Sequence, residues 1–173
     1  MTAKFDQAVS ILLQQEGGYS NNPQDRGGAT NYGISQARYP SLDVASLTVE
    51  QAKEIYRADY WQKYQCEALP WPLAMLLFDC VVNHAPLNPI RWLQTAVGAY
   101  PDGTVGPRTL AAVRACLDPV NAARDMTTQR IEYVKHLDGY STFGRGWHKR
   151  HVAVLTEAVR WAHLFNNEPR RAI

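Results

Sequence analysis

Three polar residues near the start of the chain have the types and spacing that cleavage of a glycosidic bond requires. Glu16 is followed nine residues later by Asp25, and five residues after that by Thr30. Such cleavage needs a carboxylic acid that protonates the leaving oxygen, and a second group that holds a water or stabilises positive charge on the sugar ring. An acid, a second carboxylate and a hydroxyl supply these groups. We therefore take Glu16, Asp25 and Thr30 as candidate catalytic residues.

The predicted surroundings of Glu16 favour its role as the acid. Phe5, Val9 and Leu12 recur at the offsets of one helical face, and the next position on that stripe is Glu16. A carboxylate there loses hydration and lies at the negative end of the helix dipole, so both effects should raise the pKa of Glu16. The two glycines that follow predict the end of the helix. The alternative is that Glu16 turns outward to water in the last helical turn.

Hydrophobic periodicity and capping signals predict a mainly α-helical protein of about seven helices. After the first helix, residues 19–39 have no helical period, and they predict a small lobe of loops or a β-hairpin. Thr48 and Gln51 predict a capping box that opens a helix to about Gln62. The stretch LAMLLFDCVVNHA is apolar nearly all round, which predicts a buried central helix. Gly-Pro, Asn-Pro and Asp-Pro pairs predict the start of three later helices.

Four further residues are candidates for binding a sugar. Tyr19 and Tyr32 flank the candidate acid, and an aromatic face with a polar tip suits a sugar ring, although both could equally pack within the loop. Asp79 and Asn83 are four residues apart on one face of the apolar helix. They either line a polar cleft or form an internal hydrogen-bonded pair, and we favour the cleft. Because no metal-ligand spacing is present, we expect no metal and no cofactor.

Composition limits the class of protein. A chain of 173 residues fits one compact unit, and no stretch approaches the roughly 18 apolar residues of a membrane-spanning helix. The net charge of +2 is far below that of a typical nucleic-acid binder. Cys66, Cys80 and Cys116 lack disulfide or metal spacing and predict free thiols, as in a reducing compartment. We expect a monomer that is cytoplasmic as synthesised, because no secretory signal is recognisable, without nucleic acid or stable membrane insertion.

Several motifs resemble those of a known family. The segment EGGYSNNPQDRGGATNYGIS, residues 16–35, resembles the signature of glycoside hydrolase family 108, which contains bacteriophage and bacterial N-acetylmuramidases. Four stretches further along the chain resemble the predicted peptidoglycan-binding segment that usually follows in that family: FDCVVNHAP, LQ, DGTVGPRTL and FGRGWHKR. Together the two resemblances cover nearly the whole chain.

The resemblance implies a lysozyme-like helical fold that cleaves the β-1,4 bond between N-acetylmuramic acid and N-acetylglucosamine, with Glu16 as the catalytic acid. It implies a catalytic segment 1–85 and a peptidoglycan-binding-like helical segment 86–173 that packs on it, within one compact unit 1–173. Glycan strands of peptidoglycan would be the partner, and a holin-type pore would serve a phage or prophage endolysin by analogy. Two alternatives stay open: a lytic transglycosylase, and a non-catalytic protein that binds the wall or assists secretion.

Overall fold

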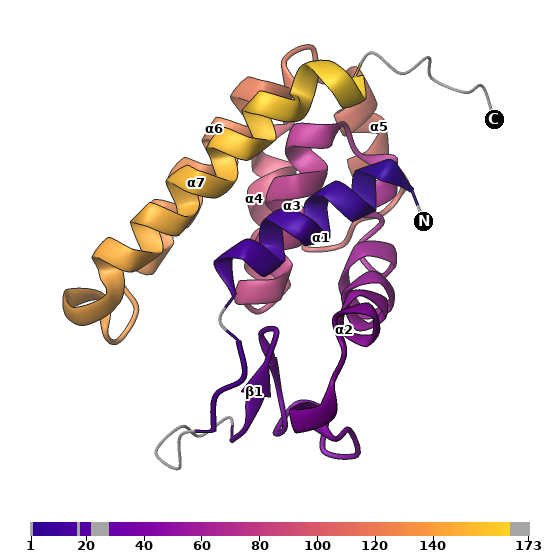
Figure 1. Ribbon diagram of the computed structural model, residues 1–173. Helices are drawn as coiled ribbons and strands as arrows, with labels where there is room; N and C mark the ends of the chain where they lie inside the picture. The colour runs from indigo at the N-terminus through magenta and orange to yellow at the C-terminus, as the bar shows by residue number, and fades with distance from the viewer. Residues whose placement is uncertain (1, 17, 22–27, 167–173) are drawn as a thin grey trace. The chain divides into compact units, whose positions relative to one another are not determined.

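The computed structural model describes residues 2–16, 18–21 and 28–166 (Figure 1). In this part of the chain seven α-helices accompany one two-stranded sheet, so the mainly helical class and the small hairpin lobe are confirmed. Contacts between residues divide the chain into two compact units, Met1–Tyr60 (unit 1) and Trp61–Ile173 (unit 2).

Unit 1 begins with helix α1, Ala3–Gln15. Its N-cap is Thr2, whose side chain accepts the N–H of Phe5 at 3.4 Å. The helix ends at Gln15, and Glu16 has extended backbone with φ −88° and ψ 146°. Glu16 is therefore not on the helical stripe that the sequence predicted for it. It is the first residue of the extended chain that leaves the helix.

A short hairpin forms the lobe that follows. Strands β1, Thr30–Asn31, and β2, Ile34–Ser35, pair antiparallel with Asn31 opposite Ile34. The buried Asn31 side chain donates from Nδ2 to the carbonyl oxygens of Val44 and Leu47, at 3.2 and 3.4 Å. One amide thus attaches the hairpin to the 3₁₀ helix η1, Val44–Ser46.

Helix α2, Val49–Tyr56, opens with the predicted capping box. Thr48 N–H donates to Gln51 Oε1 at 2.9 Å, and Gln51 N–H donates to Thr48 Oγ1 at 3.2 Å. The helical segment continues as the π-helical η2, Arg57–Gln62, so it extends to the predicted residue.

Unit 2 is built around helix α3, Trp71–Asn83, in which every residue from Trp71 to Val81 is buried. Helices α4, α6 and α7 all pack on α3, and α6 and α7 run side by side (Figure 1). This agrees with the buried central helix that the apolar sequence predicts. The other elements of unit 2 are η3, Cys66–Ala68; α4, Leu87–Ala96; α5, Pro107–Ala115; α6, Pro119–Val134; and α7, Tyr140–Asn166.

The start signals of α5 and α6 act as the sequence predicts, whereas α4 begins at Leu87, one residue before the Asn88–Pro89 pair that was expected to open it. Gly106 is the N-cap of α5, whose first residue is Pro107. Asp118 Oδ1 accepts the N–H of Asn121 at 2.9 Å before α6 begins at Pro119. None of the helices in the described ranges combines the length and the apolar composition that a bilayer crossing needs.

The three cysteines are free thiols, as expected. Cys66 and Cys80 are buried, whereas Cys116 is partly exposed. Burial raises the pKa of the Cys80 thiol to about 11, so it stays protonated and packs as a small apolar side chain.

Candidate active site

Glu16 lies against the turn of the hairpin. It is half-buried, and its carboxyl group approaches the backbone of Gly33 so closely that a Cβ atom at position 33 would lie 2.8 Å from Glu16 Oε2 and 2.9 Å from Cδ. Real Cβ atoms essentially never show such distances, so a side chain at position 33 would displace the carboxyl group from this place. The candidate acid is thus held in unit 1 by α1 on one side and the hairpin on the other.

The turn itself has an unusual composition. Tyr32 and Gly33 connect the two strands with φ angles of 51° and 76°. Two positive φ angles in a two-residue loop are the pattern of a type I′ turn, for which asparagine followed by glycine is the preferred pair. A tyrosine in the first position is sterically unfavourable.

A hydrogen bond from α2 supports this strained residue. The hydroxyl of Tyr56, at the last residue of α2, donates to the carbonyl oxygen of Tyr32 at 2.8 Å. Tyr56 is 1% exposed, so its ring is fixed by packing. A Cβ at position 33 would also lie 2.6 Å from the Tyr56 hydroxyl. The carboxyl group of Glu16 and the hydroxyl of Tyr56 therefore occupy the same small region beside Gly33.

The other predicted catalytic residues are less well placed or not described. Thr30 opens β1, and its N–H and C=O both pair with Ser20 at 2.8 Å. Its hydroxyl makes a long contact of 3.5 Å to the carbonyl oxygen of Gly28, the one hydrogen bond of this hydroxyl within the described part of the chain. Asp25 lies outside the described residues.

The two predicted sugar-binding tyrosines differ in exposure. Tyr19 is 52% exposed on the chain that follows Glu16, where its ring is accessible to a ligand. Tyr32 is half-buried in the strained turn beside Gly33. Another tyrosine of unit 1, Tyr39, donates to Asp59 Oδ2 at 2.6 Å, and burial together with this bond raises its pKa well above the usual range.

Asp79 and Asn83 belong to an internal cluster in unit 2. Asp79 is fully buried, with Oδ2 2.5 Å from Arg130 Nη1 and Oδ1 2.8 Å from Arg150 Nη2. Asn83 Nδ2 donates to the carbonyl oxygen of Asp79 at 2.7 Å and approaches Oδ1 at 3.4 Å. Of the two alternatives that the sequence allowed, these contacts are those of the internal pair. Burial opposes the charged form, but the two guanidinium groups outweigh it and hold the pKa of Asp79 below its usual range.

Two histidines complete this cluster as neutral side chains. His84 Nε2 accepts a hydrogen bond from Arg130 Nε at 2.9 Å, and burial followed by the charge of Arg130 lowers the pKa of His84 to about 4. Burial and the same charge lower the pKa of His151 to about 3. His151 is 3% exposed and its Nδ1 atom has no hydrogen-bond partner among the described residues. The cluster joins α3, α6 and α7 and contains no nucleophile or acid poised toward solvent.

Sequence reasoning missed a second polar centre, at Gln94. This buried side chain donates from Nε2 to Asp102 Oδ1, the carbonyl oxygen of Thr104 and Thr109 Oγ1 at 2.7–3.0 Å, and its Oε1 accepts the N–H of Gly103 at 2.8 Å. The loop between α4 and α5 is therefore folded around one amide. Within the described part of the chain, no group of three or more His, Cys, Asp and Glu side chains could hold a metal ion.

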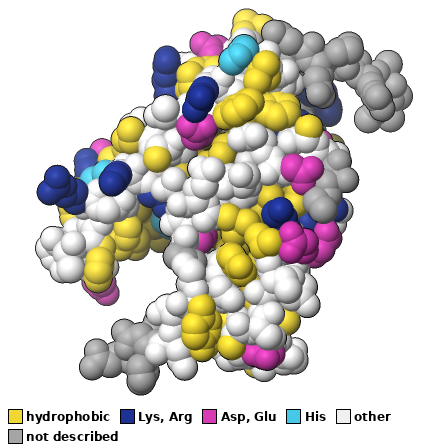
Figure 2. Space-filling view, viewed as in Figure 1, with side chains coloured by type: hydrophobic (Ala, Val, Ile, Leu, Met, Phe, Trp, Pro, Cys, Tyr) yellow, Lys and Arg dark blue, Asp and Glu magenta, His cyan; other side chains and the backbone are white. Residues whose placement is uncertain are grey.

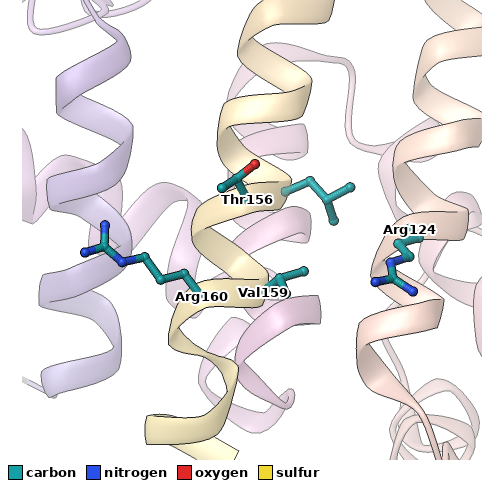
Figure 3. Close-up of a pocket in the computed structure, with 5 residues that line it drawn as sticks. Arg124, Thr156, Val159 and Arg160 are labelled. Atoms are coloured by element: carbon teal, nitrogen blue, oxygen red, sulfur yellow. The ribbon is translucent and has the colours of Figure 1, made fainter.

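A shallow hollow lies on the surface of unit 2 between α6 and α7 (Figure 3). Arg124 of α6 and Arg160 of α7 line it together with Val159, which lies between them in this view (Figure 3). Lys and Arg side chains also gather over the first turns of α7, where Arg145 and Lys149 are exposed (Figure 2). Neither region contains a predicted site residue, but both add positive charge to α7.

Comparisons with known proteins match both parts of the chain. The family profile described as glycosyl hydrolase 108 matches residues 9–85, which include Glu16 and the hairpin turn. The profile described as predicted peptidoglycan domain matches residues 88–152. No curated protein matches the chain.

One similar solved structure is that of Brucella abortus SagA. It shares 32% sequence identity with this chain, and the alignment covers 95% of this chain and 96% of that one. The TM-score of 0.80 shows that the two have the same fold, in agreement with the lysozyme-like helical fold expected from the sequence. The identity over nearly the full length and the two matched profiles establish that this chain belongs to glycoside hydrolase family 108, a family of glycosidases, with a peptidoglycan domain on its C-terminal side.

Proposed function

We propose that the protein is an N-acetylmuramidase that hydrolyses the β-1,4 bond between N-acetylmuramic acid and N-acetylglucosamine in peptidoglycan. The observation that carries this proposal is the placement of Glu16: a half-buried carboxyl group, close against the hairpin turn at Gly33, inside the segment matched by the glycosidase profile. A single carboxyl group fixed in this way fits the general acid of a glycosidase.

In this proposal Glu16 donates its proton to the glycosidic oxygen as the bond from that oxygen to the anomeric carbon breaks. Positive charge then develops on the sugar ring, and an ionised Asp25 stabilises it or activates the water that attacks the anomeric carbon. Tyr19, which is exposed near Glu16 in the chain, offers its ring to a neighbouring sugar. Thr30, with its lightly committed hydroxyl, assists in holding water.

Product analysis tests the reaction type. Purified peptidoglycan is digested and the soluble fragments are examined by mass spectrometry, with and without borohydride reduction. We expect fragments that end in a reducible N-acetylmuramic acid. Fragments that end in 1,6-anhydro-muramic acid would instead indicate a lytic transglycosylase, in which the C6 hydroxyl replaces water. The absence of any released fragment would indicate a wall-binding protein without turnover.

Substitution of Glu16 tests the acid. Glu16→Gln keeps the shape of the side chain but removes the transferable proton, so kcat/KM should fall by a factor on the order of 10² to 10⁴ with an unchanged Tm. Glu50→Gln is the matched control, because Glu50 is an exposed carboxylate in the first turn of α2 in the same unit. Equal activity of the two variants would remove Glu16 from the mechanism.

Asp25→Asn tests the second carboxylate. If Asp25 must be ionised during turnover, this variant should lose activity at neutral pH while keeping its affinity for peptidoglycan. A wild-type rate in Asp25→Asn would show that Asp25 has no catalytic role.

The biological part of the proposal is the role of a phage or prophage endolysin that reaches the wall from the cytoplasm through a holin-type pore. The matched peptidoglycan domain supports the wall as the target. Co-expression with a holin should lyse a culture, whereas Glu16→Gln with the same holin should not. Lysis by the Glu16→Gln pair would show that the pore alone is responsible.

A further inference from the structure

The close approach of two side chains to Gly33 indicates what the hairpin turn contributes to the site. Two oxygen atoms from different segments of the chain come closest to a hypothetical Cβ at this position. They are Glu16 Oε2, just after α1, and the Tyr56 hydroxyl oxygen, at the end of α2. Both lie within 3.0 Å of the same point. The missing side chain of Gly33 therefore creates the space that these two polar groups share.

The hydrogen bond that the Tyr56 hydroxyl donates determines which form of a neighbouring carboxyl group it can bind. A carbonyl oxygen can only accept, so the single proton of the Tyr56 hydroxyl is directed to Tyr32 at 2.8 Å. Toward neighbouring groups the phenol oxygen then offers only lone pairs. A carboxylic acid can donate to such an oxygen, whereas a carboxylate cannot. The hydroxyl is therefore a suitable neighbour for a carboxyl group that must carry a proton.

The strain in the turn is consistent with this role. Tyr32 has a φ angle of 51°, which costs free energy for any side chain other than glycine, asparagine or aspartate. Strained backbone of this kind occurs often at functional sites, where the surrounding structure holds it in place. Here the bond from the buried Tyr56 to the Tyr32 carbonyl holds the turn so that Gly33 faces Glu16.

We infer that Tyr56 is a positioning residue for the glycosidase reaction: its hydroxyl and the backbone of Gly33 form a cradle that holds the Glu16 carboxyl group in the orientation for proton donation. This inference rests on the proposed role of Glu16 as the general acid. In it Tyr56 does not touch substrate, and Gly33 contributes by having no side chain.

The first test removes only the hydroxyl. In Tyr56→Phe we expect kcat for release of reducing ends from purified peptidoglycan to fall by about 10- to 100-fold, because a misplaced acid transfers its proton poorly. The concentration of peptidoglycan that gives half-maximal rate should not change, since binding of the glycan strand is not affected. Tyr39→Phe is the matched control, because it removes another hydrogen-bonded hydroxyl from unit 1, the one that donates to Asp59. It should keep the wild-type kcat.

A second pair of variants tests the space that the absent side chain of Gly33 leaves for Glu16 and Tyr56. Gly33 and Gly28 have similar φ angles, 76° and 68°, so alanine is strained at both. Among the described residues, a Cβ at Gly28 meets Gln36 Cβ alone, at 3.7 Å, whereas a Cβ at Gly33 collides with Tyr56 and Glu16. Gly33→Ala should therefore lose kcat well beyond any loss in Gly28→Ala. Equal kcat in the two alanine variants would overturn the inference.

A rescue experiment separates positioning of the acid from simple support of the turn. Tyr32→Asn gives the turn its preferred asparagine–glycine pair, so the turn no longer needs the bond from Tyr56. The reference is Tyr32→Asn alone, because Tyr32 is itself a candidate for binding a sugar. The double variant Tyr32→Asn/Tyr56→Phe should have a kcat about 10- to 100-fold below that of Tyr32→Asn, because the hydroxyl beside Glu16 is still absent. Equal kcat in the single and double variants would overturn the inference, since Tyr56 would then act on the turn alone.

The Glu16→Gln variant distinguishes the two levels of failure. If Glu16→Gln is inactive and Tyr56→Phe has the wild-type kcat, only the positioning role is wrong. If Glu16→Gln is as active as the wild type, the proposed acid is wrong and the cradle has no catalytic group to hold.

Discussion

Replacing Asp79 by asparagine should cost much of the stability of unit 2, because it leaves a buried guanidinium group without an anion. Arg130 has a side chain that is 2% exposed, so it has no route to water, whereas that of Arg150 is 17% exposed. Removal of one partner from a buried ion pair costs about 3–5 kcal/mol. For a chain of this length each kcal/mol lowers Tm by roughly 2–4 °C. We therefore expect Asp79→Asn to lower Tm by about 10 °C.

The assay is thermal unfolding at pH 7, followed by circular dichroism, on three variants. Asn83→Ala is the control, since this exposed amide only donates to oxygens of Asp79 and its loss should cost about 1 kcal/mol or less. Asp79→Leu/Arg130→Met removes the two fully buried charges and leaves Arg150, whose side chain is 17% exposed, without its contact to Asp79. It should recover a large part of the stability that Asp79→Asn loses.

Two results would refute this reasoning. If Asp79→Asn had the Tm of Asn83→Ala, the cluster would not be the central ionic contact of α3, α6 and α7 that the structure shows. If Asp79→Asn kept its Tm but required more peptidoglycan for half-maximal rate, Asp79 would bind substrate, which is the role that the sequence favoured.

Acid should destabilise the protein through the histidines of the same cluster. The pKa values of His84 and His151 are about 4 and about 3 in the folded protein, below the ordinary 6.5, so the unfolded chain binds protons first as the pH falls. The contribution of these histidines to stability should therefore be full above about pH 6.5 and should decrease as the pH drops toward 4. A plot of Tm against pH measures this decrease. His151→Leu should flatten that plot, and an unchanged slope would assign the effect to other groups. Truncation after Leu137 removes α7, which packs on α3 and α6, so fragment 1–137 should lack a cooperative thermal transition. A soluble, cooperatively folded fragment with lytic activity would show that α7 is dispensable.

Local signals in the sequence predicted the helices well, because each acts over a few residues. The Thr48 capping box and the proline-led starts of α5 and α6 are satisfied by atoms within one turn of the chain. The end of α1 was wrong by one residue, and the difference matters. A helical Glu16 would have faced the apolar stripe, whereas the extended Glu16 reaches the hairpin.

The contacts that define the site depend on partners distant in sequence, so local patterns could not predict them. Tyr56 follows Tyr32 by 24 residues, and Arg150 follows Asp79 by 71. A buried aspartate on an apolar helix signals that a polar partner exists, but not which arginine it is. The tyrosine before Gly33 was a usable signal, because a tyrosine–glycine pair in a two-residue hairpin loop demands positive φ from the tyrosine.

The hydrogen bonds of the Gln94 amide restrict which substitutions the loop between α4 and α5 can accept. Its nitrogen end contacts Asp102 Oδ1, Thr104 and Thr109, and its oxygen end accepts from Gly103, so both ends are needed at once. Glutamate at position 94 would bring a second carboxylate against Asp102, and leucine would leave the loop's polar groups unsatisfied. Positions 94 and 102 are therefore expected to covary among relatives: where one changes, the other should change with it, and neither should drift alone.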